Sequence, residues 1–402
     1  MSDTPVPPGP AKSSGLAVLD LDVLDLPPAI DTGTHAGAVV LLRIAGRPCG
    51  QAVLSFRNWD EQLPLFERLT EAADSAFWEA WVAYRLGLRP EPETPTLPPI
   101  DVVICTRDRP DDLAKCLSDL MTMPDDGQRY TVIDNASRTD DTRQVVERFP
   151  GVRYVREDRP GLDIARNRAI AETTREIIAF IDDDAAPDRL WLRNLGRNFE
   201  DPLVMAAGGL TMAMELESEA QIAFQRVGGF GRGFKRMVYD AANCDPFHGW
   251  YAGAGVNMAL RRRAFAEVGL FDEALDAGTQ SLAGGDSDMF RRILNAGWQI
   301  VYDPEALNWH RHRRSMEELK RQIYGYEVAA FAILTKSLFY EREWAGVGFL
   351  AWWLRQRLSQ LRDSIGQKSD LPFNVAVTQI RGALAGPGRY RAALRKARHA
   401  GS

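Results

Sequence analysis

The stretch EIIAFIDDDA, residues 176–185, passes from an apolar strand directly into three aspartates. We expect a buried strand that ends near Ile181, with Asp182, Asp183 and Asp184 at its carboxyl end and Pro187 opening the next helix. Neighbouring carboxylates repel one another and are costly to bury unless a cation offsets their charge. Mg²⁺ and Mn²⁺ prefer such oxygen ligands and commonly share them with phosphates. The stretch therefore predicts metal-assisted chemistry on a phosphorylated substrate.

Upstream of this stretch, short apolar strands alternate with amphipathic helical patterns. The strands are expected at residues 100–105, 130–133 and 152–155, and the helices at residues 112–123, 139–149 and 161–174. Repeated strand–helix units with apolar strands predict an α/β fold, in which helices cover both faces of a mostly parallel sheet. The motifs VVICTRDRP (102–110) and VIDNAS (132–137) then end at the same edge as FIDDDA, where such folds bind ligands.

The rest of the chain divides into segments by composition. We expect a disordered tail at 1–15, an N-terminal α+β accessory segment at 16–88, a proline-rich linker at 89–99, the α/β domain at 100–313 and a C-terminal helical extension at 314–402. Within the accessory segment, the pattern predicts a strand at 16–26, a hairpin of strands 38–44 and 50–56, and one helix over 65–86. The accessory segment either recognises a partner or braces the α/β domain, and we favour the brace.

Composition limits the partners of the protein. The chain has 402 residues and a formal net charge of −6, which argues against nucleic acid as the main partner. Its four cysteines form no C-x-x-C pair, so neither a zinc site nor a disulfide framework is predicted. The N-terminus lacks the plan of a signal peptide, and a cytoplasmic location is expected.

Two C-terminal segments have two interpretations each. The run WAGVGFLAWWL, residues 344–354, is too short to span a bilayer. It predicts an amphipathic helix that packs on the main domain or makes peripheral contact with a membrane or a lipid-linked substrate, and we favour packing. The basic tail at 389–399 is interpreted as a solvated helix face, with membrane or phosphate binding as the alternative.

Four motifs in order, VVICTRDRP, VIDNAS, FIDDDA and GGDSDM (284–289), resemble the family 2 glycosyltransferases over residues 100–313. These are inverting enzymes of the GT-A fold, a Rossmann-like α/β architecture, and they use nucleotide-diphosphate sugars. The resemblance implies a nucleotide site that includes Cys105, Thr106, Arg107, Asp134, Asn135 and Arg166. Family members usually carry Tyr-Asn where this chain has Arg107-Asp108. From the residues alone, Asp134 also fits an Asx-turn cap and Arg166 a surface salt bridge.

The resemblance also implies roles for the acidic residues. Asp182 and Asp183 would lie against the ribose and the sugar. Asp184 would bind the metal together with His310, with His312 as the second choice. Asp286 would be the general base, with Gly285 in place of the common Glu and Asp288 as a helix cap or acceptor contact. From the residues alone, Asp286 also fits a helix N-cap.

The expected function is inverting transfer of a sugar, with UDP- or dTDP-sugars favoured as donors and Mn²⁺ or Mg²⁺ as cofactor. The sequence does not decide whether the acceptor is a glycan, a lipid-linked molecule, a protein or a small molecule. The glycine-rich segment 228–250 is expected to be a lid, an acceptor-contacting loop or a connection, with Trp250 and Tyr251 as sugar-stacking platforms. The alternatives are a catalytically silent nucleotide-sugar-binding scaffold and a nucleotidyltransferase, although the latter usually has a Gly-rich, Lys-bearing loop after the first strand.

Overall fold

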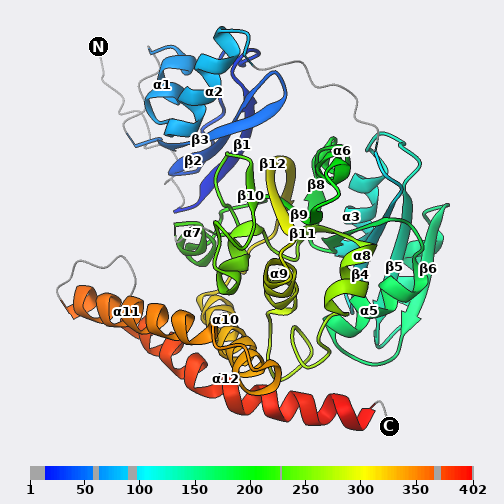
Figure 1. Ribbon diagram of the computed structural model, residues 1–402. Coiled ribbons are helices and arrows are strands. Elements are labelled where there is room, and N and C mark those ends of the chain that lie inside the picture. Colours follow the sequence, from blue (N-terminus) through cyan, green and yellow to red (C-terminus); the bar gives the residue numbers. More distant parts are fainter. Residues whose placement is uncertain (1–13, 58–62, 89–96, 227–228, 366–372, 401–402) are drawn as a thin grey trace, which may run out of the picture.

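The computed structural model describes residues 14–57, 63–88, 97–226, 229–365 and 373–400. It contains a three-stranded sheet near the N-terminus, a central nine-stranded sheet flanked by helices, and a group of long helices at the C-terminus (Figure 1). Most of the predicted tail and most of the predicted linker lie outside the described residues.

The central sheet has the strand order β10-β12-β9-β11-β7-β4-β5-β6, and β8 pairs with β12 outside this path. Its strands are β4 (Ile100–Thr106), β5 (Arg129–Asn135), β6 (Val152–Glu157), β7 (Ile177–Asp182), β8 (Ala185–Pro187), β9 (Val204–Ala213), β10 (Met237–Tyr239), β11 (Asn257–Arg261) and β12 (Gln299–His310). The intervening helices are α3 (Pro110–Leu120), α4 (Asp141–Glu147), α5 (Leu162–Glu172), α6 (Trp191–Gly196), η1 (Arg197–Glu200), α7 (Glu219–Arg226), η2 (Pro246–Ala252), α8 (Arg262–Val268) and α9 (Gly285–Asn295).

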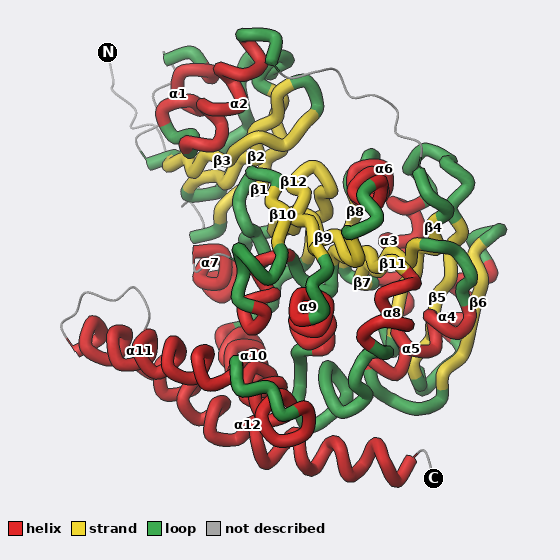
Figure 2. The backbone as a smooth tube through the Cα atoms, in the orientation of Figure 1, coloured by secondary structure: helices red, strands yellow, loops and turns green. Residues whose placement is uncertain are grey.

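The predicted α/β sheet is confirmed. Strands β6, β5, β4 and β7 lie side by side (Figure 2) and are parallel, whereas β11 is antiparallel to β7 and β9. Successive side chains of a strand point to opposite faces, so Val102 and Ile104 of β4 join one apolar core and Val103 joins the other. Because both faces are covered, the polar residues that end β4, β5 and β7 meet at one edge.

The prediction that Pro187 opens a helix is wrong. Residues 185–187 form β8, which pairs antiparallel with residues 308–310 of β12. The side chain of Asp188 then accepts a hydrogen bond from the backbone N–H of Leu190, and α6 begins at Trp191. The pairing sets the position of His310, because that residue lies opposite Ala185, directly after Asp184.

The accessory segment folds as a small α+β unit. It contains β1 (Leu16–Asp22), β2 (Gly37–Ile44), β3 (Arg47–Ser55), α1 (Leu65–Glu71) and α2 (Ser75–Arg85). The hairpin of β2 and β3 is confirmed. The single helix predicted over 65–86 is instead two helices, because Asp74 interrupts it and caps α2 by accepting a hydrogen bond from the backbone N–H of Phe77 at 3.0 Å.

This unit shares an apolar core with the central sheet. Val39 and Leu41 of β2 pack in one buried cluster with Leu210 of β9 and Leu307 of β12. An ion pair between Arg43 and Asp188, at 2.7 Å, lies beside this cluster. A shared core of this kind supports the interpretation of residues 16–88 as a brace.

The C-terminal extension is helical, as predicted. It consists of α10 (Met316–Lys336), a π-helical turn η3 (Ser337–Glu341), α11 (Gly346–Ile365) and α12 (Phe373–Ala400). Ser315 and Glu318 form a capping box at the start of α10. Within the described parts of the chain, we find no helix that combines the length and the apolar character needed to cross a membrane. The run 344–354 packs Phe349 and Trp353 into a buried cluster, but Trp344 and Leu354 are exposed.

Candidate active site

A large cavity lies at the carboxyl edge of the sheet, and we call it the central cavity. Its volume is about 1290 Å³. Residues from β7, α5, α9, β12 and the segments beside them contribute charged side chains to its wall. These include Arg109, Arg166, Asp182, Asp286, His310 and Arg313. The edge at which parallel strands end is the expected place for a ligand in this fold.

Two aspartates and a histidine meet at the border of this cavity: Asp182 and His310 line its wall, and His310 contacts Asp184. One ligand atom from each of Asp182, Asp184 and His310 lies within 4.8 Å of the other two. The Nε2 atom of His310 lies 3.1 Å from Asp184 Oδ1, whereas its buried Nδ1 atom has no hydrogen-bond partner in the described structure. Two carboxylates with an imidazole make a donor set that suits Mn²⁺ and related cations. The three residues therefore fit a divalent metal.

The charges of these carboxyl groups are linked. Burial, followed by the negative charge of Asp184, raises the pKa of Asp182 to about 6. Burial alone would raise the pKa of Asp184 as well, but the hydrogen bond and charge of His310 outweigh it and hold that pKa well below its ordinary value. The Nη1 atom of Arg109 adds to this effect from 3.0 Å. Like charges held together in this way are what a bound cation would relieve.

Asp183 has a different environment from its two neighbours. Its carboxylate accepts hydrogen bonds from the hydroxyl of Thr106 at 2.6 Å and from Arg109 at 3.0 Å. Burial raises its pKa to about 7, although Arg109 opposes the shift. Neither Asp183 nor Asp184 lines the central cavity, and the hydrogen bond from Thr106 ties Asp183 to β4.

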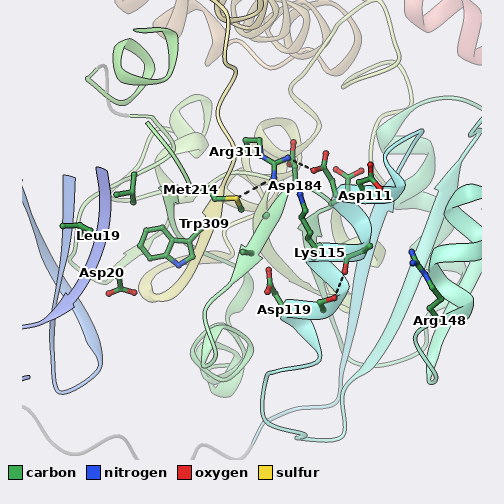
Figure 3. A pocket seen from close by; sticks show the side chains of 18 residues that line it. Leu19, Asp20, Asp111, Lys115, Asp119, Arg148, Asp184, Met214, Trp309 and Arg311 are labelled. Carbon is green, nitrogen blue, oxygen red and sulfur yellow. Dashed lines mark hydrogen bonds and ion pairs between the residues drawn. The ribbon is translucent and has the colours of Figure 1, made fainter. Parts of the chain in front are cut away.

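Asp183 and Asp184 also border a second hollow, which we call the outer groove. It has a volume of about 950 Å³ and lies between β1, α3 and β12. Figure 3 shows Trp309 and Asp20 on one side of this groove and Lys115 and Asp119 of α3 on the other. Asp184 therefore lines the outer groove, and its partner His310 lines the central cavity.

Asp286 stands in the first turn of α9 and faces the central cavity. Its Oδ2 atom accepts a hydrogen bond from the backbone N–H of Gly255 at 2.6 Å, and Oδ1 accepts one from the backbone N–H of Ser287 at 2.7 Å. The N-cap of α9 is Gly284, so the alternative reading of Asp286 as the helix cap is wrong. A Cβ atom at position 255 would lie 3.2 Å from Asp286 Oδ2, so glycine permits this close approach.

Asp288 does not contact the cavity. Its side chain is fully buried and forms ion pairs with Arg291, Arg292 and Lys336, at 3.1, 2.9 and 2.8 Å. The expected role as an acceptor contact is wrong, because no part of this carboxylate reaches solvent. Asp288 instead ties α9 to α10.

Arg166 is buried and forms buried ion pairs, so the alternative of a surface salt bridge does not apply. Its Nη1 atom donates to Asp163 at 2.9 Å and to Asp276 at 2.7 Å, and its guanidinium lies over the ring of Phe271. A Cβ atom at Gly255 would lie 2.6 Å from Arg166 Nη2. Gly255 thus brings the two functional candidates Arg166 and Asp286 into one corner of the cavity.

The other predicted nucleotide residues lie at the same sheet edge but outside the wall of the central cavity. Asp134 is fully buried and accepts hydrogen bonds from Tyr154 at 2.7 Å and from Arg156 at 2.9 Å. Asn135 bridges backbone groups of Arg159 and Gly161. These contacts stiffen the loop that leads into α5.

Cys105, Thr106 and Arg107 differ in their exposure. Burial raises the pKa of Cys105 to about 12, so its thiol is protonated at neutral pH. Thr106 is buried against Asp183. Arg107 is about half exposed and lies 4.0 Å from Asp108, which has a positive φ of 55°. Of these three, Arg107 has the side chain that is free to reach a ligand from the rim.

His312 does not join the metal group. Its Nε2 atom lies 3.4 Å from Gln225, and its ring packs edge-on against Phe224. Burial and the neighbouring His310 lower its pKa to about 4. The geometry is therefore consistent with the preference for His310 over His312 as the metal ligand.

Sequence reasoning missed three residues that organise the site. Arg109 stands in the motif VVICTRDRP but was given no role there, yet its side chain contacts Asp183 and Asp184. Asp163 and Asp276 hold Arg166, and neither was singled out. Asp163 was visible within GLDIARN, three residues before Arg166 on one helix face, but Asp276 lies 110 residues away from its partner.

Comparison with known proteins identifies the class. Residues 101–269 match the model of the family described as Glycosyl transferase family 2. This part of the chain matches the family 2 glycosyltransferases, and its mostly parallel α/β sheet agrees with the fold that the motifs implied.

Several characterised proteins are similar to parts of the chain. The pre-mycofactocin glycosyltransferase of Mycobacterium tuberculosis is 28% identical over 171 residues, which are 42% of this chain and 34% of that protein. The chain thus spans about a third of that relative's length. Glycosyltransferase AglE of Haloferax volcanii is 24% identical over 236 residues, 57% of this chain and 72% of that protein. The mannosyltransferase PcManGT from Pyrobaculum calidifontis, solved with GDP-Man and Mn²⁺, has a TM-score of 0.46 at 19% identity, with 81% of this chain and 83% of that chain covered.

Proposed function

We propose that this protein is a metal-dependent inverting glycosyltransferase that transfers a sugar from a nucleotide-diphosphate sugar to an acceptor hydroxyl. The observation that carries the proposal is the meeting of Asp182, Asp184 and His310, because Asp182 and His310 line the cavity that also contains Asp286. A cation site and a separate carboxylate in one cavity are the two parts that such a transfer needs. The match of residues 101–269 to family 2 supports the same reaction class.

The metal would be held by Asp184 and His310, with Asp182 as the third ligand. When bound, Mn²⁺ or Mg²⁺ would offset the charge of the departing diphosphate. Arg109 contacts Asp184 and Arg313 shares the same cavity, so both cations are available to the phosphate oxygens. The cationic side chains orient the diphosphate and keep its charge balanced within the cavity.

The nucleotide would lie across the ends of β4 and β5. Arg107 at the rim and Asp134 and Asn135 below it are proposed to recognise the base and ribose, together with Arg166. We favour a uridine or thymidine donor on the resemblance of VIDNAS to the family motif. Cys105 and Thr106 would shape the floor of this site, and Asp183 would support it through Thr106.

Asp286 is the proposed general base. The backbone N–H of Gly255 fixes Oδ2, and Ser287 fixes Oδ1, so the carboxylate is held in one orientation with lone pairs to spare. In an inverting transfer, the base takes the proton of the acceptor hydroxyl on the face opposite to the leaving group. Asp286 would accept that proton at a carboxylate oxygen while the acceptor oxygen attacks the anomeric carbon.

The acceptor would approach past the aromatic wall of the cavity. Trp250 and Tyr251 of η2 line this wall together with Phe349 of α11, and the rings of Trp250 and Phe349 are 6.1 Å apart. Aromatic faces of this kind suit the C–H face of a sugar ring or an isoprenoid chain. A glycan, a lipid-linked glycan, a glycosylated protein and a small molecule would each fit this description.

The experiment that tests the proposal is a thermal-shift titration of the full chain with UDP-, dTDP-, GDP- and CMP-sugars, with and without Mn²⁺. We expect one nucleotide class to raise the melting temperature only when Mn²⁺ is present, because ligand and metal bind the folded state together. NMR of the product, once an acceptor is found, would then show the inverted anomeric configuration. The absence of a shift with every donor would contradict the proposed donor site, and a retained configuration would contradict the inverting step.

A further inference from the structure

The helix α11 has two apolar faces, and only one is buried. Phe349 and Trp353 pack inward, but Val347, Leu354 and Leu358 are 50%, 47% and 66% exposed. With Ala351 they recur at intervals of four, three and four residues, so they form one stripe along the helix. Trp344, 76% exposed, precedes this stripe by three residues. Single exposed apolar side chains are ordinary, but a continuous stripe marks a contact surface.

Basic residues accompany this apolar stripe. Arg355 and Arg362 are exposed and lie on the same face, because they follow Ala351 and Leu358 by four residues each. Residues 344–400 contain ten arginines and lysines but two aspartates, a formal charge of +8, whereas the whole chain has a charge of −6. The positive charge is therefore concentrated in the segment that carries the stripe. An apolar face with a basic border is complementary to an anionic lipid surface.

The neighbouring helix continues the basic border. Phe339, 66% exposed at the junction between α10 and α11, lies beneath the guanidinium of Arg391 of α12 at 5.8 Å. Four further basic residues of α12 are exposed: Arg381, Arg395, Lys396 and Arg398. Helices α11 and α12 lie at the edge of the molecule opposite the β1–β3 sheet (Figure 1). This edge can meet a flat surface without contact from the accessory unit.

The same helices border the central cavity. Phe349 and Gln360 of α11 and Gln379 of α12 contribute to its wall. A surface that held α11 would thus lie close to the cavity that contains Asp286. The apolar stripe, the local excess of positive charge and this position are independent observations.

We propose that α11 docks in the plane of an anionic lipid bilayer, with its stripe in the interfacial region and Arg355 and Arg362 against lipid phosphates. The contact is peripheral and goes beyond the transfer reaction, since it needs neither donor nor metal. It would also hold the cavity next to lipid-linked molecules in that bilayer. Only this consequence rests on the proposed function.

The test is sedimentation of the full chain with vesicles of equal parts phosphatidylcholine and phosphatidylglycerol, and with vesicles of phosphatidylcholine alone. We expect binding to the anionic vesicles that weakens with added salt, and little binding to the neutral ones. In the double variant Leu354→Ser/Leu358→Ser, partitioning should fall roughly tenfold or more, because two leucine side chains no longer enter the lipid interface. Both positions are exposed, so the melting temperature should not change.

The matched control is Val82→Ser/Leu86→Ser in and after α2, where the side chains are 53% and 66% exposed on the accessory unit. It should bind the vesicles as the wild type does. Failure of the wild type to bind anionic vesicles, or an equal loss in both double variants, would overturn the proposal. So would a wild-type dimer in analytical ultracentrifugation that Leu354→Ser/Leu358→Ser converts to monomer, because the stripe would then be a contact between two copies.

Discussion

The carboxylate of Asp163 occupies the space that a side chain at position 285 would need. A Cβ atom built on Gly285 would lie 2.1 Å from Asp163 Oδ2 and 2.5 Å from its Cγ. This relationship explains why the position before Asp286 is glycine in this chain. The carboxylate of Asp163 in α5 is buried there and holds Arg166.

We therefore predict that Gly285→Ala lowers the free energy of unfolding by about 1–3 kcal/mol, as expected for an overpacked site. The double variant Asp163→Ala/Gly285→Ala should lose less than the sum of the two single variants, because the clash is then absent. Chemical denaturation of the four proteins measures this coupling. Gly388→Ala is the control, since a Cβ atom there has no neighbour within 4 Å. Additive losses at 163 and 285 would refute the explanation.

The metal site gives a second prediction. Asp184→Ala should weaken Mn²⁺ binding in the presence of the donor nucleotide by at least tenfold, because it removes a charged ligand from the cluster of Asp182, Asp184 and His310. Isothermal titration calorimetry with Mn²⁺ measures the affinity. Asp119→Asn in the outer groove is the control and should bind Mn²⁺ like the wild type. Equal affinity in wild type and Asp184→Ala would remove Asp184 from the metal site.

Substitutions of His310 and His312 should differ in their effect on Mn²⁺ affinity in the same assay. His310→Ala is expected to weaken Mn²⁺ binding, whereas His312→Ala should leave the affinity unchanged even if it lowers the melting temperature. The reason is that His310 lies 3.1 Å from Asp184, while His312 packs against Phe224 and Gln225. A larger loss of affinity in His312→Ala than in His310→Ala would reverse the assignment.

Substitution of the proposed base should separate donor binding from transfer. Asp286→Asn keeps the shape of the side chain but removes its capacity to take a proton, so kcat should fall by roughly 10²–10⁴-fold. The metal-dependent thermal shift with the donor should stay within error of the wild type. Near-normal turnover in Asp286→Asn would exclude Asp286 as the base. Ser287→Ala removes the hydroxyl that donates to Asp286 Oδ1 at 3.2 Å, so it tests whether the loss comes merely from a displaced carboxylate.

Asp288 predicts how stability depends on pH. Burial would raise its pKa, but Lys336, Arg292 and Arg291 outweigh burial and hold the pKa well below the ordinary value. The group therefore contributes stability that is fully present above the unfolded-state pKa of about 4 and is lost as the pH falls toward the folded pKa.

Asp288→Asn should therefore flatten the acid side of the stability curve. At neutral pH it should also cost about 3–5 kcal/mol, since three cations then lose their shared buried partner. Urea denaturation at a series of pH values between neutral and acid measures both effects. Asp158→Asn, at an 86% exposed side chain, is the control. An unchanged pH profile in Asp288→Asn would show that the ion-pair cluster does not contribute to acid sensitivity.

The fold was largely predictable because each strand of the parallel half is continuously apolar and ends in polar residues. Ile177–Asp182 shows both features in one stretch, and the structure confirms its place beside β4. The accessory helix over 65–86 was less predictable. Its apolar period continues through Ala72 and Ala73, and the break depends on one cap at Asp74 that a periodic pattern does not reveal.

The residues of the candidate site were predictable where they stand within a sequence motif, and less predictable where they come from segments far apart in the sequence. Asp184 and Asp286 stand in motifs, but the partners of Arg166 come from α5 and from the loop that contains Asp276. The different environment of Asp183 also escaped prediction, since a run of three identical residues does not indicate which carboxylate turns toward Thr106. Long-range ion pairs of this kind require the folded arrangement of the segments.

The shared core between β2 and the central sheet has a consequence for how the chain can be divided. A shortened protein that began at residue 100 would uncover the faces of Leu210, Met212, Tyr302 and Leu307 that now lie against Val39 and Leu41. Such a fragment would expose an apolar patch to water, and it should self-associate at concentrations at which the full chain stays dispersed. The proline-rich segment at 89–99 is thus not a position at which the chain can be divided into two fragments that both stay dispersed.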